Sequence, residues 1–303
     1  MTKKIIYIKT LLIIFAGVVM VGVSCGARER PKADSPQGSI EVYTPNPVVP
    51  EKIRIWGETQ DMRRSDLHER LDRELTALAY THGNTLLCIK RSNRYRDEIT
   101  KILKKNGVPE DMFYLAVIES FLDDRAYSPA KAAGIWQFIP STAKEYGLEV
   151  NEFVDERYNL PKATEAACRY FKDAYARYGD WNTVTASYNG GMARISKELE
   201  SQRQDSALDL YLTSETSRYP FRIMAMKLIL ENPHKYGFYV ADNQLYPPSE
   251  FEEVVVDTPV SDWVAWSKSH GMSYARLREL NPWIRAKSLP NKTGKKYTVR
   301  VSD

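Results

Sequence analysis

A helical spacing of apolar residues, which begins near Ser65 and continues to about residue 232, constrains the fold of this chain more than any other feature. Its first stretch repeats leucine at steps of four and three residues, with charged residues between, which places the leucines on one helix face: Leu67, Leu71, Leu75 and Leu78. Further helical stretches lie at 95–105, 110–122, 141–146, 161–177, 181–187, 191–200 and 216–231. Because no segment between 60 and 232 alternates as a strand does, the sequence predicts an all-helical body over 61–232.

After about residue 250 the pattern changes to that of a small α+β module. Two β-rich segments enclose two short helical segments, at Phe251–Val256, Ser261–His270, Ser273–Leu280 and Tyr297–Val301. A module this small has a small core, which its tryptophans would fill: Trp263, Trp266 and Trp283. The sequence therefore predicts a mainly α protein that ends in an α+β module over 251–303, joined by a linker over 233–250.

The first 24 residues have the order of regions of a secretory signal. Three lysines precede an apolar run of thirteen residues, Leu11 to Val23, whereas a membrane-spanning helix needs about 20. The run ends in Gly22-Val23-Ser24 directly before Cys25, which resembles the bacterial lipobox, where the cysteine is lipidated. The sequence predicts a lipoprotein-type signal peptide over 1–24 and a lipid-anchored protein that faces the periplasm, most simply from the outer membrane. A plain signal peptide and a short uncleaved anchor remain alternatives.

Residues 26–50 hold five prolines among polar residues, at Pro31, Pro36, Pro45, Pro47 and Pro50. Such a segment cannot bury enough apolar surface to form a core. We expect it to be part of an extended tether over 25–60 that holds the folded body away from a membrane surface.

Composition and charge exclude several classes of protein. Hydrophobic residues make up 43% and charged residues 27% of the chain, as in soluble globular proteins. The chain has 43 Lys and Arg against 39 Asp and Glu, and three of the lysines lie in the segment 1–24, so the rest has a net charge of only +1. The sequence therefore predicts no nucleic-acid partner.

The metal-binding residue types form no ligand pattern. The four histidines are scattered, with no His-x-x-x-His or Cys-x-x-Cys pair: His68, His82, His234 and His270. Cys88 and Cys168 lie in apolar helical segments and are predicted to be core thiols, although two cysteines can also pair in an oxidising periplasm. No metal and no other cofactor are predicted.

Glu119 is the first candidate for chemistry, near the end of the helix expected from Pro109. Apolar residues surround it at one-turn spacing: Leu115, Ala116 and Leu122. Desolvation there and the negative end of the helix dipole should raise the pKa of its carboxyl. A carboxyl that stays protonated near neutral pH is what a general acid needs. Taken alone, the same residue also fits a Glu that solvates a helix end.

Three further clusters combine small, polar and aromatic residues, at Tyr127–Pro140, Ser187–Gly191 and Glu215–Tyr219. In the first, the small residues up to Gly134 allow a close backbone approach, and Gln137 offers a neutral donor and acceptor. Taken one at a time, the clusters also fit a loop, a helix C-cap and a helix N-cap.

In order and spacing, the four clusters resemble the catalytic domain of lytic transglycosylases, enzymes with a lysozyme-like fold that cut peptidoglycan. Within that family they are most similar to the membrane-bound lytic murein transglycosylase D type. The family motifs are matched by Glu119-Ser120, by Gly134 to Gln137, by Ser187-Tyr188-Asn189 and by Glu215 to Tyr219, with Ser128 at the family's serine position. The resemblance covers about 65–232, and Ser187 and Ile139 depart from the usual Ala and Met.

The resemblance implies cleavage of the glycosidic bond between N-acetylmuramic acid and N-acetylglucosamine, for remodelling and turnover of the cell wall. Glu119 would protonate the glycosidic oxygen, the substrate's own N-acetyl group would stabilise the developing cation, and Glu119 would then deprotonate the C6 hydroxyl. The product would be a 1,6-anhydro sugar, formed without water. The implied substrate-binding residues are Ser128, Gly134, Gln137, Tyr188, Asn189 and Tyr219.

Two other functions remain open at this point. A muramidase-type hydrolase on the same fold would use water and a second carboxylate, for which Asp123 and Asp124 are the sequence candidates; we expect both to be surface residues. A non-catalytic wall-binding lipoprotein would grip glycan without cutting it, but such a protein gains nothing from a carboxyl that it must desolvate.

Residues 251–303 are similar to a degenerate LysM domain, a strand-helix-helix-strand unit that binds chains of N-acetylglucosamine. The best-matching piece is Leu280-Asn281-Pro282, whereas Pro259-Val260-Ser261-Asp262 stands where such modules usually open with Gly-Asp-Thr-Leu. Glycan binding and a purely structural cap are both consistent with this sequence.

Overall fold

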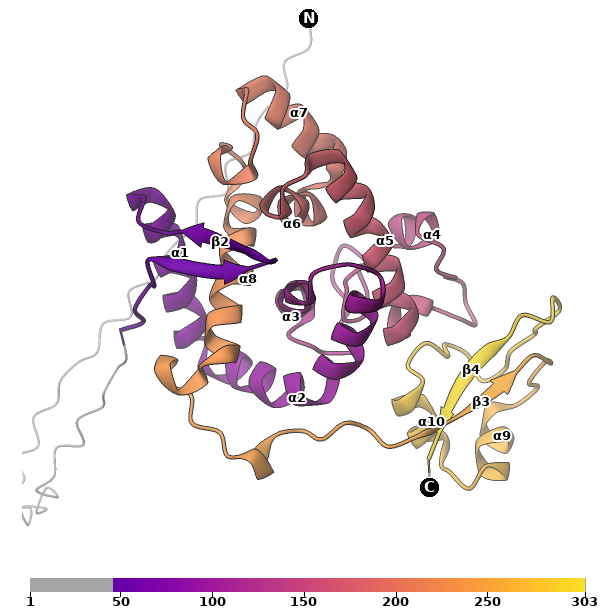
Figure 1. Ribbon diagram of the computed structural model, residues 1–303. Helices are drawn as coiled ribbons and strands as arrows, with labels where there is room; N and C mark the ends of the chain where they lie inside the picture. The colour runs from indigo at the N-terminus through magenta and orange to yellow at the C-terminus, as the bar shows by residue number, and fades with distance from the viewer. Residues whose placement is uncertain (1–45, 303) are drawn as a thin grey trace, which may run out of the picture. The chain divides into compact units, whose positions relative to one another are not determined.

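The computed structural model describes residues 46–302, which fall in one compact unit (Figure 1). The predicted signal peptide, Cys25 and the first part of the predicted tether lie outside the described residues. Within residues 46–302, no helix is long and apolar enough to cross a membrane.

The helical body confirms the mainly α prediction. Its helices are α1 (Ser65–Tyr80), α2 (His82–Lys105), α3 (Phe113–Ser120), α4 (Pro140–Glu145), α5 (Leu160–Tyr178), α6 (Trp181–Gly190), α7 (Met192–Gln202) and α8 (Ser214–Glu231). Helix α3 is apolar around its whole circumference and therefore lies in the middle of the body, where it contacts α2 and α8 (Figure 1). Helix α8 also packs on α1 and α6.

A β-hairpin precedes the helices, which corrects the prediction of a tether as far as residue 60. Strands β1 (Lys52–Ile55) and β2 (Glu58–Asp61) are antiparallel and joined at Trp56-Gly57, where both residues have positive φ, as two-residue hairpin turns require. Ile53 and Ile55 alternate with exposed residues and are buried in the core of the helical body. Four alternating residues are too short a signal to separate from the proline-rich segment before them.

Helix α2 begins at His82, thirteen residues before the start at residue 95 that the sequence predicted. Its first turn contains Gly83 and Asn84, which are poor helix formers, so the sequence did not predict a helix there. Cys88, on this helix, and Cys168, on α5, are buried free thiols, as predicted. Burial raises the pKa of each thiol to about 12.

The C-terminal module has the predicted strand-helix-helix-strand order: β3 (Glu252–Val256), α9 (Trp263–Ser269), α10 (Tyr274–Leu280) and β4 (Tyr297–Val301). The two strands pair antiparallel from Glu252 opposite Val301. Trp263 and Trp283 are buried in its core, whereas Trp266 is half-buried and stacks on His270, with ring centroids 3.7 Å apart.

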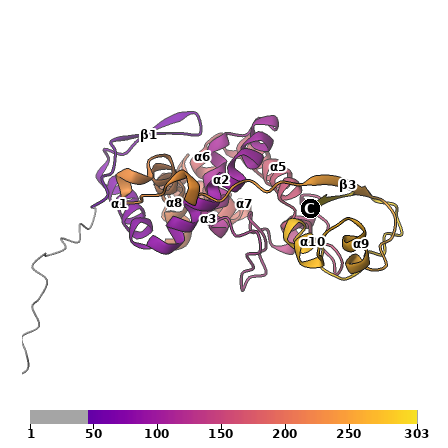
Figure 2. The same ribbon diagram turned by 90° about the horizontal axis from the view of Figure 1, so that it is seen from below.

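The module shares its core with the loop that precedes α5. Val154 of this loop forms a β-bridge with Ile284, the amide of Asp155 donates to the Trp283 carbonyl over 2.9 Å, and Val154 is buried in the module's core cluster. The predicted linker also has contacts of its own. Phe238 stacks on His82 of α2, and the Tyr246 amide donates to the Lys90 carbonyl over 3.0 Å, so the segment follows α2, as Figure 2 shows.

Candidate active site

Glu119 lies in the last turn of α3, at the wall of a cleft of about 960 Å³. The helix ends directly after it, because Phe121 and Leu122 take left-handed backbone conformations with φ of 51° and 54°. The other seven residues of α3 are buried, so Glu119 alone of this helix presents its side chain to the cleft. The cleft also contains most of the polar residues that the sequence predicted: Ser128, Gln137, Tyr188 and Asn189.

The surroundings of Glu119 favour the protonated form of its carboxyl. Desolvation raises the pKa of Glu119 to about 7, against the lowering effects of a hydrogen bond from Tyr219 and the charge of Arg222. Among residues 46–302, Glu119 has no ion-pair partner. The carboxyl is therefore protonated in a large fraction of molecules at neutral pH, which meets the requirement for a general acid.

Two tyrosines flank Glu119 in different ways. The buried Tyr219 of α8 donates its hydroxyl hydrogen to the Glu119 carboxyl. The hydroxyl of Tyr188 instead donates to the Trp136 carbonyl over 2.7 Å, and its ring packs between Phe138 and Tyr170. Tyr188 therefore offers the cleft its ring, because its hydroxyl hydrogen is already engaged.

Ser128 and Gln137 keep complementary groups for a ligand. The Ser128 oxygen accepts from the Ala132 amide over 3.1 Å, which leaves its hydrogen to donate. The Gln137 amide nitrogen donates to the Gly134 carbonyl over 2.8 Å, and its side-chain oxygen accepts from no described residue. One side chain thus offers a donor and the other an acceptor.

Gly134 does not line the cleft, and the structure gives a packing reason for glycine there. Its φ is +73°, and an added Cβ would lie 2.1 Å from the carbonyl oxygen of Arg157. The close approach that the sequence predicted is therefore to the protein's own backbone. A contact between Gly134 and substrate stays a prediction.

Asn189 is held from α8 at the other wall of the cleft. Its oxygen accepts from the Thr216 hydroxyl over 2.9 Å, and its nitrogen donates to Glu215 over 3.4 Å. Glu215 also lines the cleft, and its negative charge contributes to the raised pKa of Glu119.

Besides Glu119, the cleft is lined by the carboxyl groups of Glu145 and Glu215, whereas the sequence candidates for a second carboxyl were Asp123 and Asp124. Neither aspartate lines the cleft, and Asp124 lines a separate pocket with Tyr95. A signal for Glu215 was present: it precedes Tyr219 by four residues, so both lie on one face of a single helix.

No metal centre is apparent in the described part of the chain. Residues 46–302 contain no cluster of three or more His, Cys, Asp or Glu side chains that could hold a metal ion.

Two regions of the chain match known domain families. Residues 97–210 match the transglycosylase SLT domain, and residues 252–303 match the soluble lytic transglycosylase C-terminal LysM-like domain. Over 241 residues the chain is 28% identical to membrane-bound lytic murein transglycosylase D of Escherichia coli (strain K12), which covers 77% of this chain and 51% of that protein. The chain thus spans about half the length of the curated relative it matches.

Two solved structures of lytic transglycosylases have a lower sequence identity to this chain. An inactive mutant of lytic transglycosylase Slt from Pseudomonas aeruginosa is 16% identical, with a TM-score of 0.37 over 52% of this chain and 27% of that one. The 70 kDa soluble lytic transglycosylase from Escherichia coli is 17% identical, with a TM-score of 0.40 over 51% of this chain and 27% of that one. The chain thus contains an SLT domain and a LysM-like domain, and over most of its length it is similar to a membrane-bound lytic murein transglycosylase.

Proposed function

We propose that the protein is a peptidoglycan lytic transglycosylase that cuts the bond between N-acetylmuramic acid and N-acetylglucosamine and leaves 1,6-anhydro ends. The observation that carries this proposal is Glu119, a carboxyl whose pKa is raised to about 7 at the wall of a cleft of about 960 Å³. Such a group can give a proton and take one back at the same pH. The match to the SLT domain and the similarity to a lytic murein transglycosylase support the same reaction class.

In the proposed first step, protonated Glu119 gives its proton to the glycosidic oxygen, and the bond between that oxygen and C1 of the muramic acid breaks. Ser128 and Gln137 hold the sugar with one donor and one acceptor, and the N-acetyl group of the muramic acid stabilises the developing cation. In the second step the ionised Glu119, which the Tyr219 hydroxyl stabilises, takes the proton of the C6 hydroxyl. The 1,6-anhydro ring closes as that oxygen bonds to C1, and no water is consumed.

The product distinguishes this proposal from hydrolysis. Mass spectrometry of muropeptides released from purified sacculi should find products lighter by one water than those of a lysozyme. Products with free reducing ends would overturn the transglycosylase proposal in favour of a muramidase.

Asp123 and Asp124 do not line the cleft, whereas Glu145 and Glu215 do. The hydrolase alternative rests first on Glu215, because its charge acts on Glu119. Glycosidases that use water or a covalent intermediate need two carboxyl groups flanking the bond. If Glu119 suffices, Glu215→Gln should reduce the rate no more than a few-fold and should lower the pKa of Glu119 slightly, since a nearby negative charge is removed. A loss as large as that of Glu119→Gln, together with reducing-end products, would favour the hydrolase.

We further propose that Cys25 anchors the protein by lipid to a membrane facing the periplasm, with the region before the hairpin as a tether. The lipobox-like Gly22-Val23-Ser24-Cys25 supports this proposal, as does the name of the membrane-bound relative. Cells fed a fatty-acid analogue should label the wild-type protein and not Cys25→Ser. If the wild type takes up no label, the anchor is of another kind.

A further inference from the structure

A second groove, of about 900 Å³, lies between the helical body and the C-terminal module. It is lined on the side of the body by Arg125, Tyr127 and Tyr158, and on the side of the module by Tyr274, Arg278 and Arg285. The sequence predicted no function for any of these six residues.

The groove shares a wall with the cleft of Glu119. Tyr127, which is 60% exposed, lines the groove, and the next residue, Ser128, lines the cleft. Arg157 also lines the groove, and its guanidinium donates to the carbonyl of Phe138, a cleft residue, over 3.0 Å. The groove and the cleft therefore adjoin at the segment Tyr127-Ser128.

The groove has positive charge that the protein does not neutralise. Its acidic residues are already paired, Asp155 with Arg157 at 2.7 Å and Glu279 with Arg276 at 3.6 Å. Arg125, Arg278 and Arg285 have no carboxylate within ion-pair distance among residues 46–302. The Nε of Arg278 is buried and has no hydrogen-bond partner in the described part of the chain.

Aromatic rings hold two of these guanidinium groups in place. Arg285 lies over the Tyr158 ring at 4.4 Å, and Arg278 donates to the Tyr274 hydroxyl over 2.9 Å. A guanidinium stacked on an aromatic face keeps its edge free for a carboxylate. The groove thus offers oriented donors for anionic groups.

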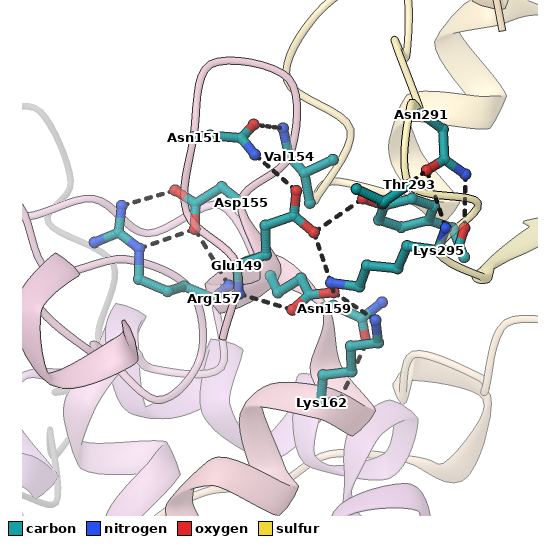
Figure 3. A network of polar contacts seen from close by, with 12 residues as sticks. Glu149, Asn151, Val154, Asp155, Arg157, Asn159, Lys162, Asn291, Thr293 and Lys295 are labelled. Atoms are coloured by element: carbon teal, nitrogen blue, oxygen red, sulfur yellow. Dashed lines mark hydrogen bonds and ion pairs between the residues drawn. The ribbon is translucent and has the colours of Figure 1, made fainter. Parts of the chain in front are cut away.

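A polar network fixes the two walls of the groove to each other (Figure 3). The ammonium of Lys295, from the module, donates to Glu149 over 2.6 Å and to Glu156 over 2.9 Å. Asn151 accepts from the Val154 amide over 2.8 Å and so shapes the loop that also carries Arg157. These contacts join both walls of the groove around one buried carboxylate.

We propose that this groove binds the carboxylates of the stem peptides on the glycan strand that lies in the cleft. The inference rests on the proposed function, because it takes peptidoglycan as the substrate. Each muramic acid of such a strand bears a short peptide with free carboxylates, and planar guanidinium groups bind carboxylates with two parallel hydrogen bonds. The groove would thereby select strands that still carry peptides.

The test compares two substrates on the full-length chain: glycan strands with intact stem peptides, and the same strands stripped of their peptides by an amidase. We expect the wild type to have the higher kcat/KM on strands with peptides. The double variant Arg278→Gln/Arg285→Gln should lower the ratio of the two kcat/KM values about tenfold, equivalent to about 1.4 kcal/mol. Arg125→Gln, from the opposite wall, should lower the ratio in the same direction.

Lys268→Gln is the matched control, because Lys268 is an exposed cation on α9 of the same module and does not line the groove. It should leave the ratio unchanged. The double variant Arg278→Lys/Arg285→Lys should retain part of the ratio, because lysine keeps the positive charge but cannot donate two parallel hydrogen bonds to a carboxylate. Thermal unfolding of each variant shows whether the module stays folded.

An equal loss on both substrates, or no loss on either, would overturn the inference while leaving the proposed function intact. If the wild type cuts neither substrate, the proposed function fails instead. Binding of peptide-bearing strands to the Glu119→Gln chain then tests the groove separately: weaker co-sedimentation after the double substitution supports the groove, and unchanged co-sedimentation refutes it.

Discussion

Glu119 and Glu156 are the same residue type, and the protein desolvates both side chains, but their carboxyl groups behave in opposite ways. Glu119 has no cation bonded to it in the described residues, and desolvation raises its pKa to about 7. Desolvation acts on Glu156 as well, but hydrogen bonds from Lys162, from the Glu149 amide and from Lys295 together bring its pKa below the ordinary value. Desolvation therefore raises the pKa of a carboxyl, as an acid catalyst needs, only where no cation pairs with that carboxyl.

The two settings also differ in what they contribute to the fold. Glu156 joins the C-terminal module to the helical body through Lys295, so its charge is structural. Glu119 has no such partner, so its ionised form is a cost to stability that the active site tolerates. Four experiments test this contrast, and they are ordered from the largest expected effect to the smallest.

Glu119→Gln should abolish nearly all activity. Glutamine keeps the shape of the side chain but has no proton to give, and a placed acid or base contributes about 10²- to 10⁴-fold to the rate. Release of soluble muropeptides from sacculi measures the loss. Asp123→Asn and Asp124→Asn are matched controls outside the cleft and should retain activity. An active Glu119→Gln enzyme would show that the catalytic acid is another residue.

Replacing both Lys162 and Lys295 by Met should destabilise the protein by about 3 kcal/mol, because Glu156 is left as a buried charge without a cation. Denaturant unfolding at pH 7 measures this difference. A lowered pKa stabilises the fold above the ordinary value of 4.5, so the deficit of the variant should shrink as pH falls below it.

The control for this variant is Lys105→Met. The side chain of Lys105 is 78% exposed and pairs with Glu165 at 3.6 Å, so its loss should change stability by less than about 1 kcal/mol. Equal effects of the two substitutions would mean that the network around Glu156 contributes no more than a surface ion pair.

Stability as a function of pH should have the opposite sign at Glu119. A raised pKa means that the folded state binds the proton more tightly, so stability falls as pH rises from about 4.5 to about 7. Glu119→Gln removes this cost and should be more stable than the wild type by up to about 3 kcal/mol above pH 8. The two proteins should be equally stable near pH 4, which serves as the internal control. Parallel stability curves over the whole range would contradict the raised pKa.

Tyr219→Phe should lower activity about tenfold and raise the pKa of Glu119, because the hydroxyl that stabilises the ionised carboxyl is removed. The falling limb of the pH–rate profile should move to higher pH. Tyr114→Phe is the control, since this hydroxyl donates to Glu231 over 3.1 Å and does not line the cleft. A change in rate without a shift of the profile would assign Tyr219 a purely structural role.

Periodicity predicted the long elements well and the short ones poorly. The helical body and the strand-helix-helix-strand module follow from apolar spacing, because long amphipathic segments have one buried face. The hairpin at 52–61 was missed because its strands have only four residues each. The beginning of α2 was missed because its first turn has weak helix propensity and is held by tertiary contacts such as the stacking of His82 on Phe238.

Most of the cleft was also predictable, because its polar residues stand in ordered motifs. The roles of individual atoms were not predictable. Whether the Tyr188 hydroxyl is free depends on the Trp136 carbonyl, 52 residues away, and the reason for Gly134 is the Arg157 backbone. In the sequence, Glu215 is only the first residue of a motif, and its position in the cleft follows from the packing of α8.

The sequence by itself determined the classes of structure and chemistry: a helical body, a small α+β module, and a carboxyl on an apolar helix face. These follow from local spacing, which needs no knowledge of distant residues. Only the tertiary structure decided which carboxyl is raised in pKa and which is lowered, and that the module and the body enclose an arginine-lined groove. Desolvation and ion pairing depend on what surrounds a group in space, and for Glu156 and Lys295 the partners lie 139 residues apart in the chain.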